Sequence, residues 1–168
     1  IDNYIYSYLK NYNYIPYAGE EDSLVNNNWD SCDVYHTGFT LRGYLEVAQL
    51  LGHNENTTLK LMHKMLHDFH DKDKKIIKFK NRPNHYQDIH GLAEYILIFA
   101  LCYDTLNTNE RDYFLNICFN NIKSFFHGGT YYYTIRGKTK NKLYMPRWGH
   151  APMMNAISQL LLSIKSVN

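Results

Sequence analysis

The sequence predicts an all-α protein made of stacked helical hairpins, with short β-hairpin insertions between the helices. Two observations support this fold class. Apolar residues recur every three or four positions along five segments, as they do on the buried face of a helix. A unit of loop, histidine, buried helix and amphipathic helix also recurs with a period of roughly 55 residues, which is typical of helical repeats.

Each of the five periodic segments carries its own boundary signals. Gly52 follows the first segment and is expected to be its C-terminal cap, whereas Asn56 is the expected N-cap of the second. Asn107 or Thr108 caps the fourth. The third segment is apolar on nearly all sides, so we expect it to be buried. The expected helices cover residues 36–51, 57–71, 89–105, 109–126 and 151–165, and residues 3–10 are a further candidate.

The segments between the helices predict loops and short strands. Residues 12–34 contain a proline, a glycine and three consecutive asparagines, which indicates a long loop. Residues 75–86 are expected to hold a short strand and a turn. Residues 129–145 alternate around a glycine and predict a β-hairpin. Its loop is expected to run through Gly137–Asn141, because we find no two-residue turn chemistry there.

Composition and charge limit the classes of function. The chain has 168 residues and is expected to form one domain, 1–168, large enough to bury a core. A hydrophobic fraction of 45% excludes a disordered chain. The formal net charge of +2 argues against a nucleic-acid partner, because only Lys72–Lys80 approaches a basic stripe. The longest apolar run, Ile96–Tyr103, is too short to span a bilayer.

No pattern predicts a metal or a cofactor, and we expect neither. The three cysteines are too few for a disulfide framework, so we expect free thiols and a cytoplasmic location. His63, His67 and His70 lie on one face of the second expected helix, but Lys64 stands where the HExxH motif of zinc enzymes has glutamate. Three ligands from one straight helix rarely complete a tetrahedral site. Phosphate-binding glycine loops and the nucleophile-elbow motif are absent.

A histidine stands at the start of three of the apolar helices, followed by small residues. If the repeats stack in parallel, these helix starts lie at one end and present their free N–H groups to a shared cavity. Taken singly, each histidine is more readily explained as a helix cap or a satisfied buried group than as a functional residue. Aromatic, acidic and imidazole side chains together favour a polyhydroxylated ligand. The residues expected around this cavity are Trp29, Asp30, Asp33, Tyr35, His36, Arg42, His85, Tyr86, Asp88, His90, Arg147, Trp148 and His150.

The three helix-start motifs resemble a known family in combination. They are the runs at 33–39 (DVYHTGF), 86–93 (YQDIHGLA) and 144–153 (YMPRWGHAPM). Together they resemble the C-terminal half of bacterial (α/α)-toroid proteins encoded with polysaccharide-biosynthesis genes and related to six-hairpin glycosidase and lyase-like toroids. The resemblance covers about residues 29–165 and implies part of an (α/α) toroid in a carbohydrate context. His150 stands where the related pattern has glutamine.

Two chemistries fit the candidate residues. Glycosidic cleavage needs two carboxylates, which Asp33 and Asp88, or Asp30, can supply. Lyase or epimerase chemistry needs a proton abstractor near neutral pH, for which His36, His90 and Tyr35 are candidates. The expected catalytic residues are therefore Asp33, His36, Asp88 and His90. Those expected to bind substrate are Trp29, Tyr35, Arg42, Tyr86, Arg147, Trp148 and His150.

Other classes of function remain open at this stage. The same residues would serve a non-catalytic glycan-binding or scaffold module of a polysaccharide-assembly system. A helical-repeat domain for protein interaction would instead carry its features on a concave helix face. The chain begins with isoleucine, so we expect its native start to be missing. Three hairpins are about half of a closed six-hairpin ring, so an apolar edge should be exposed for the missing N-terminal region or a second subunit.

Overall fold

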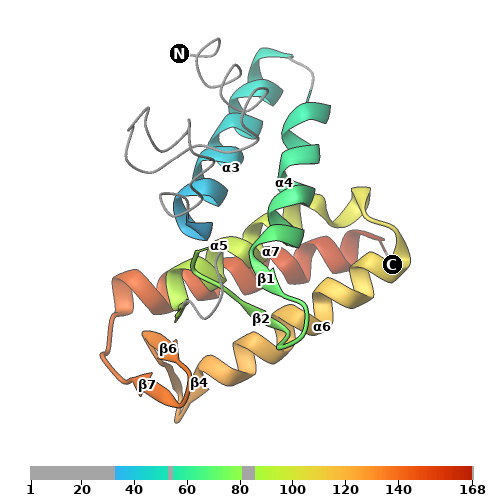
Figure 1. The fold of residues 1–168 in the computed structure, drawn as a ribbon. Coiled ribbons are helices and arrows are strands. Elements are labelled where there is room, and N and C mark those ends of the chain that lie inside the picture. Colours follow the sequence, from blue (N-terminus) through green and yellow to red (C-terminus); the bar gives the residue numbers. More distant parts are fainter. Residues whose placement is uncertain (1–32, 53–54, 81–85, 168) are drawn as a thin grey trace, which may run out of the picture.

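A computed structural model describes residues 33–52, 55–80 and 86–167. The predicted helical fold is confirmed for these residues (Figure 1). Trp29, Asp30 and His85, the candidate helix at 3–10 and most of the expected 12–34 loop lie outside them. The α-helices are α3 (Val34–Leu51), α4 (Asn56–Asp68), α5 (Ile89–Cys102), α6 (Thr108–Phe125) and α7 (Ala151–Val167), with a 3-10 turn η2 (Tyr103–Thr105) and a π-helical turn η3 (Pro146–His150).

Helix α5 is the centre of the core. It contacts α3, α4, α6 and α7, and Tyr95, Ile96 and Phe99 on different sides of it are fully buried. Burial of one such side chain contributes about 1.5–3 kcal/mol. The all-round apolar character of this segment therefore produced the predicted outcome: a helix that must be surrounded.

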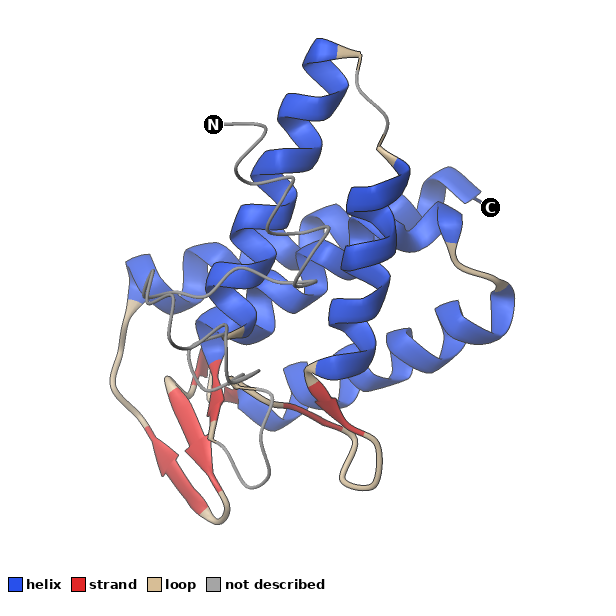
Figure 2. Cartoon of the chain, turned by 45° about the horizontal axis from the view of Figure 1, so that its top comes forward, coloured by secondary structure: helices blue, strands red, loops and turns tan. Residues whose placement is uncertain are grey.

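The other helices pack around α5 in two directions. Helices α3 and α4 form an antiparallel pair that crosses α5 and α7 steeply, as Figures 1 and 2 both show. Helix α7 lies alongside α5, and α6 runs back in the opposite sense. Helices α3, α5 and α7 all begin on the same side of the molecule, at the left of Figure 1.

Short antiparallel strands connect the helices. Strand β1 (His70–Asp71) pairs with β2 (Ile76–Ile77), and β4 (Phe126–His127) pairs with β5 (Thr130–Tyr131). A three-stranded sheet is formed by β3 (Gln87–Asp88), β6 (Thr134–Arg136) and β7 (Thr139–Asn141), in that order. In it, Asp88 lies opposite Thr134. This sheet holds the start of α5, because the backbone N–H of Ile89 donates to the Tyr133 carbonyl at 3.0 Å.

Two predicted helix caps are confirmed. Gly52 ends α3 with a φ of 65°, a left-handed conformation that glycine adopts without steric cost. Asn107 begins α6 in a capping box, in which its side chain accepts from the N–H of Glu110 while the Glu110 carboxylate accepts from the N–H of Asn107.

The second expected helix was wrong at both ends. Its N-cap is Glu55, without a side-chain hydrogen bond, and Asn56 is already helical. The helix ends at Asp68 rather than at residue 71, because His70 and the residue after it join strand β1. The pairing of β1 with β2 is a tertiary contact that helical periodicity does not report.

The predicted hairpin within 129–145 exists, but its expected loop was wrong. Arg136 pairs with Thr139, so only Gly137 and Lys138 form the turn. Gly137 has a φ of 57°, and a glycine with positive φ at the first turn position is one of the standard ways to close a two-residue hairpin.

The described residues carry exposed apolar side chains on α3 and α7. An exposed apolar edge was expected, without its location. Leu50 of α3 is 85% exposed, and α7 exposes Met154, Leu161 and Leu162. What covers them stays a prediction. None of the described helices combines the length and the apolar character needed to cross a bilayer.

We predict that Gly91→Ala destabilises the fold, whereas Gly43→Ala does not. A Cβ on Gly91 would lie 2.5 Å from Cγ1 of Val34, a fully buried side chain at the α3–α5 contact that has no room to shift. Overpacking of this kind costs about 1–3 kcal/mol. Nothing lies within 4 Å of a Cβ on Gly43, so the control should gain about 0.5–1 kcal/mol from helix propensity. Urea denaturation measures both; equal free energies of unfolding would contradict the prediction.

Candidate functional site

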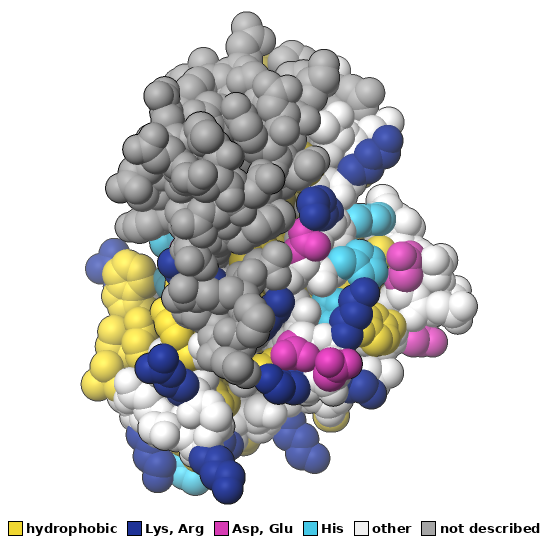
Figure 3. All heavy atoms as spheres, viewed as in Figure 1, with side chains coloured by type: hydrophobic (Ala, Val, Ile, Leu, Met, Phe, Trp, Pro, Cys, Tyr) yellow, Lys and Arg dark blue, Asp and Glu magenta, His cyan; other side chains and the backbone are white. Residues whose placement is uncertain are grey.

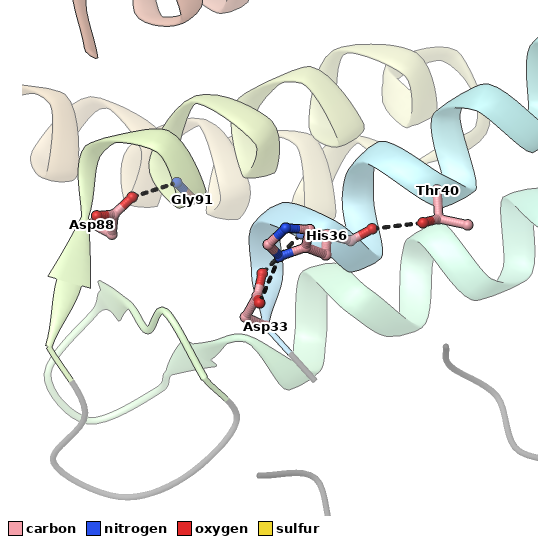
Figure 4. A network of polar contacts seen from close by, with 5 residues as sticks. All are labelled: Asp33, His36, Thr40, Asp88 and Gly91. Atoms are coloured by element: carbon pink, nitrogen blue, oxygen red, sulfur yellow. Dashed lines mark hydrogen bonds and ion pairs between the residues drawn. The ribbon is translucent and has the colours of Figure 1, made fainter. Parts of the chain in front are cut away.

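Asp33 and Asp88 occupy equivalent positions at the starts of α3 and α5 (Figure 4). One oxygen of Asp33 accepts from the backbone N–H of His36 at 2.8 Å, and the other accepts from the His36 ring nitrogen Nδ1, also at 2.8 Å. One oxygen of Asp88 accepts from the N–H groups of His90 and Gly91. Both candidate acids are thus N-caps, a role that stabilises a helix by about 1 kcal/mol.

The recurring helix-start motif therefore has the same local structure at α3 and α5. In each, an aspartate in extended conformation caps the helix and a histidine follows within the first turn. The third motif differs, because α7 is preceded by the π-helical turn η3, which holds Trp148 and has no acidic residue in its first turn.

The three motifs nevertheless meet in one group of rings, which we call the ring cluster: Tyr35, His36, His90 and Trp148. The ring of Tyr35 stacks on that of His90, with centroids 4.0 Å apart and 20° between the planes. The ring of Trp148 meets that of His90 edge-on, with the ring centroids 5.3 Å apart. The ring centroids of Tyr35 and His36 are 4.8 Å apart, and the angle between the two ring planes is 75°. Side chains from α3, α5 and η3 therefore converge beside the start of α5.

A hollow of about 210 Å³ adjoins the ring cluster, and Tyr35 and His90 form part of its wall. A second hollow of about 240 Å³ shares Arg42, Leu97 and Asn155 with the first. The two together form an open depression between α3 and α7 with α5 as its floor, which we call the α3–α7 groove. Its lining comprises Tyr35, Phe39, Arg42, Glu46, His90, Ala93, Glu94, Leu97, Ala100, Leu101, Pro152, Asn155, Gln159 and Ser163.

Arg42 and Glu94 form an ion pair in this groove. The Nε and Nη2 atoms of Arg42 donate to the two carboxylate oxygens of Glu94 at 2.9 and 3.4 Å. Glu94 is 4% exposed, and burial raises the pKa of its carboxyl while Arg42 opposes that rise. Sequence reasoning missed Glu94. The available signal was an acidic residue in an apolar helix, because a buried carboxylate requires a partner.

His90 is suited to accept a proton. Burial lowers the pKa of its imidazole, and the nearby His36 lowers it further. Among the described residues, no hydrogen bond engages either ring nitrogen of His90. A neutral imidazole in the wall of a hollow meets the basic requirement for a general base.

Other expected site residues lie away from the ring cluster. Tyr86 and Asp88 line a separate groove of about 270 Å³ with Tyr133, Thr134 and Arg136. Burial raises the pKa of Asp88, although the N–H groups that it accepts from oppose this. His150 is held by Thr130, whose hydroxyl lies 2.6 Å from its Nε2 atom.

No protein-family model, curated protein or solved structure matches this chain. The resemblance to (α/α)-toroid proteins therefore stays a prediction from three motifs. A function for this chain has to be inferred from the residues described above.

Arg147 and the three histidines of the second expected helix add little to the ring cluster. Arg147 is exposed, with its guanidinium 5.7 Å from the centre of the Trp148 ring. His63 is hydrogen-bonded to Thr105. His70 of β1 is buried and contacts α4 and α6. Within the described parts of the chain, no three potential metal ligands gather at one point.

We predict that His70 makes the fold less stable in acid. Its Nδ1 lies 2.8 Å from the Leu66 carbonyl oxygen and its Nε2 lies 2.9 Å from the Tyr113 hydroxyl, so the ring is held inside the fold. Burial lowers its pKa in the folded state. The unfolded chain therefore binds a proton first, and stability falls as the pH drops below about 6.5. Urea denaturation at pH 7.5 and 5.5 should show a smaller loss for His70→Asn than for wild type.

Tyr113→Phe is the companion variant to that experiment. It removes a hydroxyl that can donate to the neutral ring or accept from the charged one and leaves the buried imidazole in place, so its loss of stability in acid should stay close to that of wild type. Identical pH dependence in wild type and His70→Asn would contradict the role of His70.

We predict that Arg42→Met destabilises the fold by about 2 kcal/mol, because it leaves the Glu94 carboxylate buried without its partner. The Arg42 side chain is 26% exposed, so the loss should be below the 3–5 kcal/mol of a fully buried pair. Adding Glu94→Gln should restore much of the stability. A double-mutant cycle by urea denaturation measures the coupling; additive effects of the two substitutions would contradict it.

Proposed function

We propose that the chain binds a glycan in the α3–α7 groove, with a sugar ring against the ring cluster. The observation that supports this most is the meeting of Tyr35, His90 and Trp148 from three separate helix starts. Trp148 is 47% exposed, so it keeps an apolar face for a sugar ring. Arg42, Glu94 and Asn155 supply polar groups along the same groove, the usual composition of a small-molecule site.

If the protein is an enzyme, proton abstraction by His90 is the chemistry that we propose. The neutral imidazole lies in the groove wall. Cleavage by two carboxylates fits less well, because both oxygens of Asp33 are bonded to His36 and Asp88 lines a different groove. Lyase or epimerase chemistry needs one base of this kind near neutral pH.

A non-catalytic glycan-binding or scaffold module is the second candidate, and one observation favours it. The groups with the greatest catalytic potential already have structural partners: Asp33 and Asp88 cap helices, and Glu94 is paired with Arg42. A binding module needs only the rings and the polar lining.

The toroid and the partners of the chain are part of the same proposal. Alternation of a buried helix with amphipathic helices supports the proposal that the chain forms an arc of an (α/α) toroid. In this proposal, the N-terminal region or a second subunit covers the exposed apolar residues of α3 and α7. The steep crossing of α3 over α5 differs from the near-parallel neighbours of a regular ring. The cytoplasmic location stays a prediction from the sequence.

A glycan array on the full chain tests this proposal. We expect Trp148→Ala to weaken glycan binding about tenfold, the effect of losing one aromatic contact of ~1.4 kcal/mol. Phe119→Ala is the matched control, because Phe119 is an exposed aromatic on α6, outside the groove. An array without signal, or equal losses in both variants, would overturn the proposal.

His90→Gln separates the two candidates once a glycan is found. Retained binding with lost turnover indicates an enzyme with His90 as its base. Turnover that is absent in wild type as well, with binding that depends on Trp148, indicates a binding module.

A further inference from the structure

The charges of this protein are divided unequally along the chain. Residues 113–168 contain seven lysine and arginine side chains and no aspartate or glutamate. Residues 1–112 carry eleven basic and sixteen acidic side chains, a formal charge of −5. The small net charge of +2 therefore conceals a strongly basic C-terminal third. Such an asymmetry is the electrostatic mark of an anionic partner.

The basic residues are concentrated on one projecting element. The β6–β7 hairpin extends from the helical body (Figures 1 and 2). Arg136, Lys138, Lys140 and Lys142 alternate along it, and every residue from 136 to 144 is exposed. In Figure 3, dark-blue side chains gather over this lower-left part of the molecule and no magenta one appears among them. Among the described residues, no carboxylate forms an ion pair with these cations.

Exposed apolar side chains follow the basic residues directly. Leu143 is 53% exposed and Tyr144 is 64% exposed. The turn that carries them is ordered by a hydrogen bond, because the N–H of Leu143 donates to the Asn141 side chain at 3.0 Å. Cations next to an exposed leucine and tyrosine form the combination that binds the interface of an anionic bilayer, where the cations meet lipid phosphates and the apolar groups enter the headgroup layer.

The shape of the element favours a lipid surface over a soluble polymer. A single-stranded polyanion is held along a groove lined by cations, whereas this hairpin is a projection with all its cations exposed. The groove beside it contains the carboxyl of Asp88, which would repel a polyanion. A soluble polyanion would also gain nothing from Leu143.

We propose that the β6–β7 hairpin, together with Leu143 and Tyr144, docks the protein on an anionic lipid bilayer. The hairpin lies on the surface without spanning the membrane. Lysine and arginine side chains supply most of the affinity through the negative potential of the lipid, and the two apolar side chains add contact with the headgroup layer. This inference does not depend on the α3–α7 groove or on the nature of its ligand.

Vesicle co-sedimentation of the full chain tests the proposal. We expect binding to vesicles of phosphatidylcholine mixed with phosphatidylglycerol, little binding to phosphatidylcholine alone, and loss of binding as salt rises. Removing one lysine should weaken binding about fivefold, so the double variant Lys138→Gln/Lys142→Gln should lose roughly 30-fold. The matched control is Lys72→Gln/Lys74→Gln, which removes the same charge at the β1–β2 turn, where Asp71 and Asp73 are neighbours.

A second variant distinguishes lipid from a soluble polyanion. Leu143→Ser/Tyr144→Ser should weaken vesicle binding and leave all cations in place. The proposal is overturned if Leu143→Ser/Tyr144→Ser binds vesicles as tightly as wild type. It is also overturned if this variant and wild type both bind a single-stranded oligonucleotide or polygalacturonate as tightly as they bind vesicles. A third contradicting result is equal vesicle binding by Lys138→Gln/Lys142→Gln and its control. All six substituted positions are exposed, and far-UV circular dichroism verifies that each variant is folded.

Discussion

Burial of nearly all of α5 is the constraint on which the other elements depend. A helix that is apolar on nearly all sides exposes little of its surface to water, so other helices must cover most of it. Helices α3, α4, α6 and α7 do so. The closeness of α3 requires glycine at two contacts: Gly91 lies against Val34, and Gly38 lies against the side chain of Glu94. Packing here leaves no room for a methyl group.

The candidate site follows from the way α5 begins. Its first turn leaves the core beside the starts of α3 and α7, so the polar residues before each helix come together where the apolar packing ends. The same residues then have two kinds of role. Asp33 holds His36 through two hydrogen bonds, and Tyr35 and Trp148 surround His90. A site built on helix caps is well ordered, but its carboxylates are already hydrogen-bonded within the caps. This favours the imidazole of His90 as the reactive group.

The ion pair of Arg42 with Glu94 extends this reasoning to the groove. A carboxylate in the core-facing helix is tolerated because an arginine from α3 reaches it. The pair joins the two helices that also supply the ring cluster. Charge elsewhere is arranged differently: the basic β6–β7 hairpin lies on the outside of the fold, where its cations are hydrated and available to a partner.

Local signals in the sequence determined most of the helical structure. Periodicity located the five α-helices of the described residues to within a few positions. Gly52 marked the end of one and Asn107 the start of another, because each signal acts within one or two turns. Contacts between distant residues decided the rest. Strand β2 ended α4 early, Arg42 found Glu94 across 52 positions, and the pairing of β3 with β6 placed Asp88 in a different groove from His90. A sequence pattern reports which face of an element is apolar, whereas the partner of each polar side chain depends on how those faces cross in space.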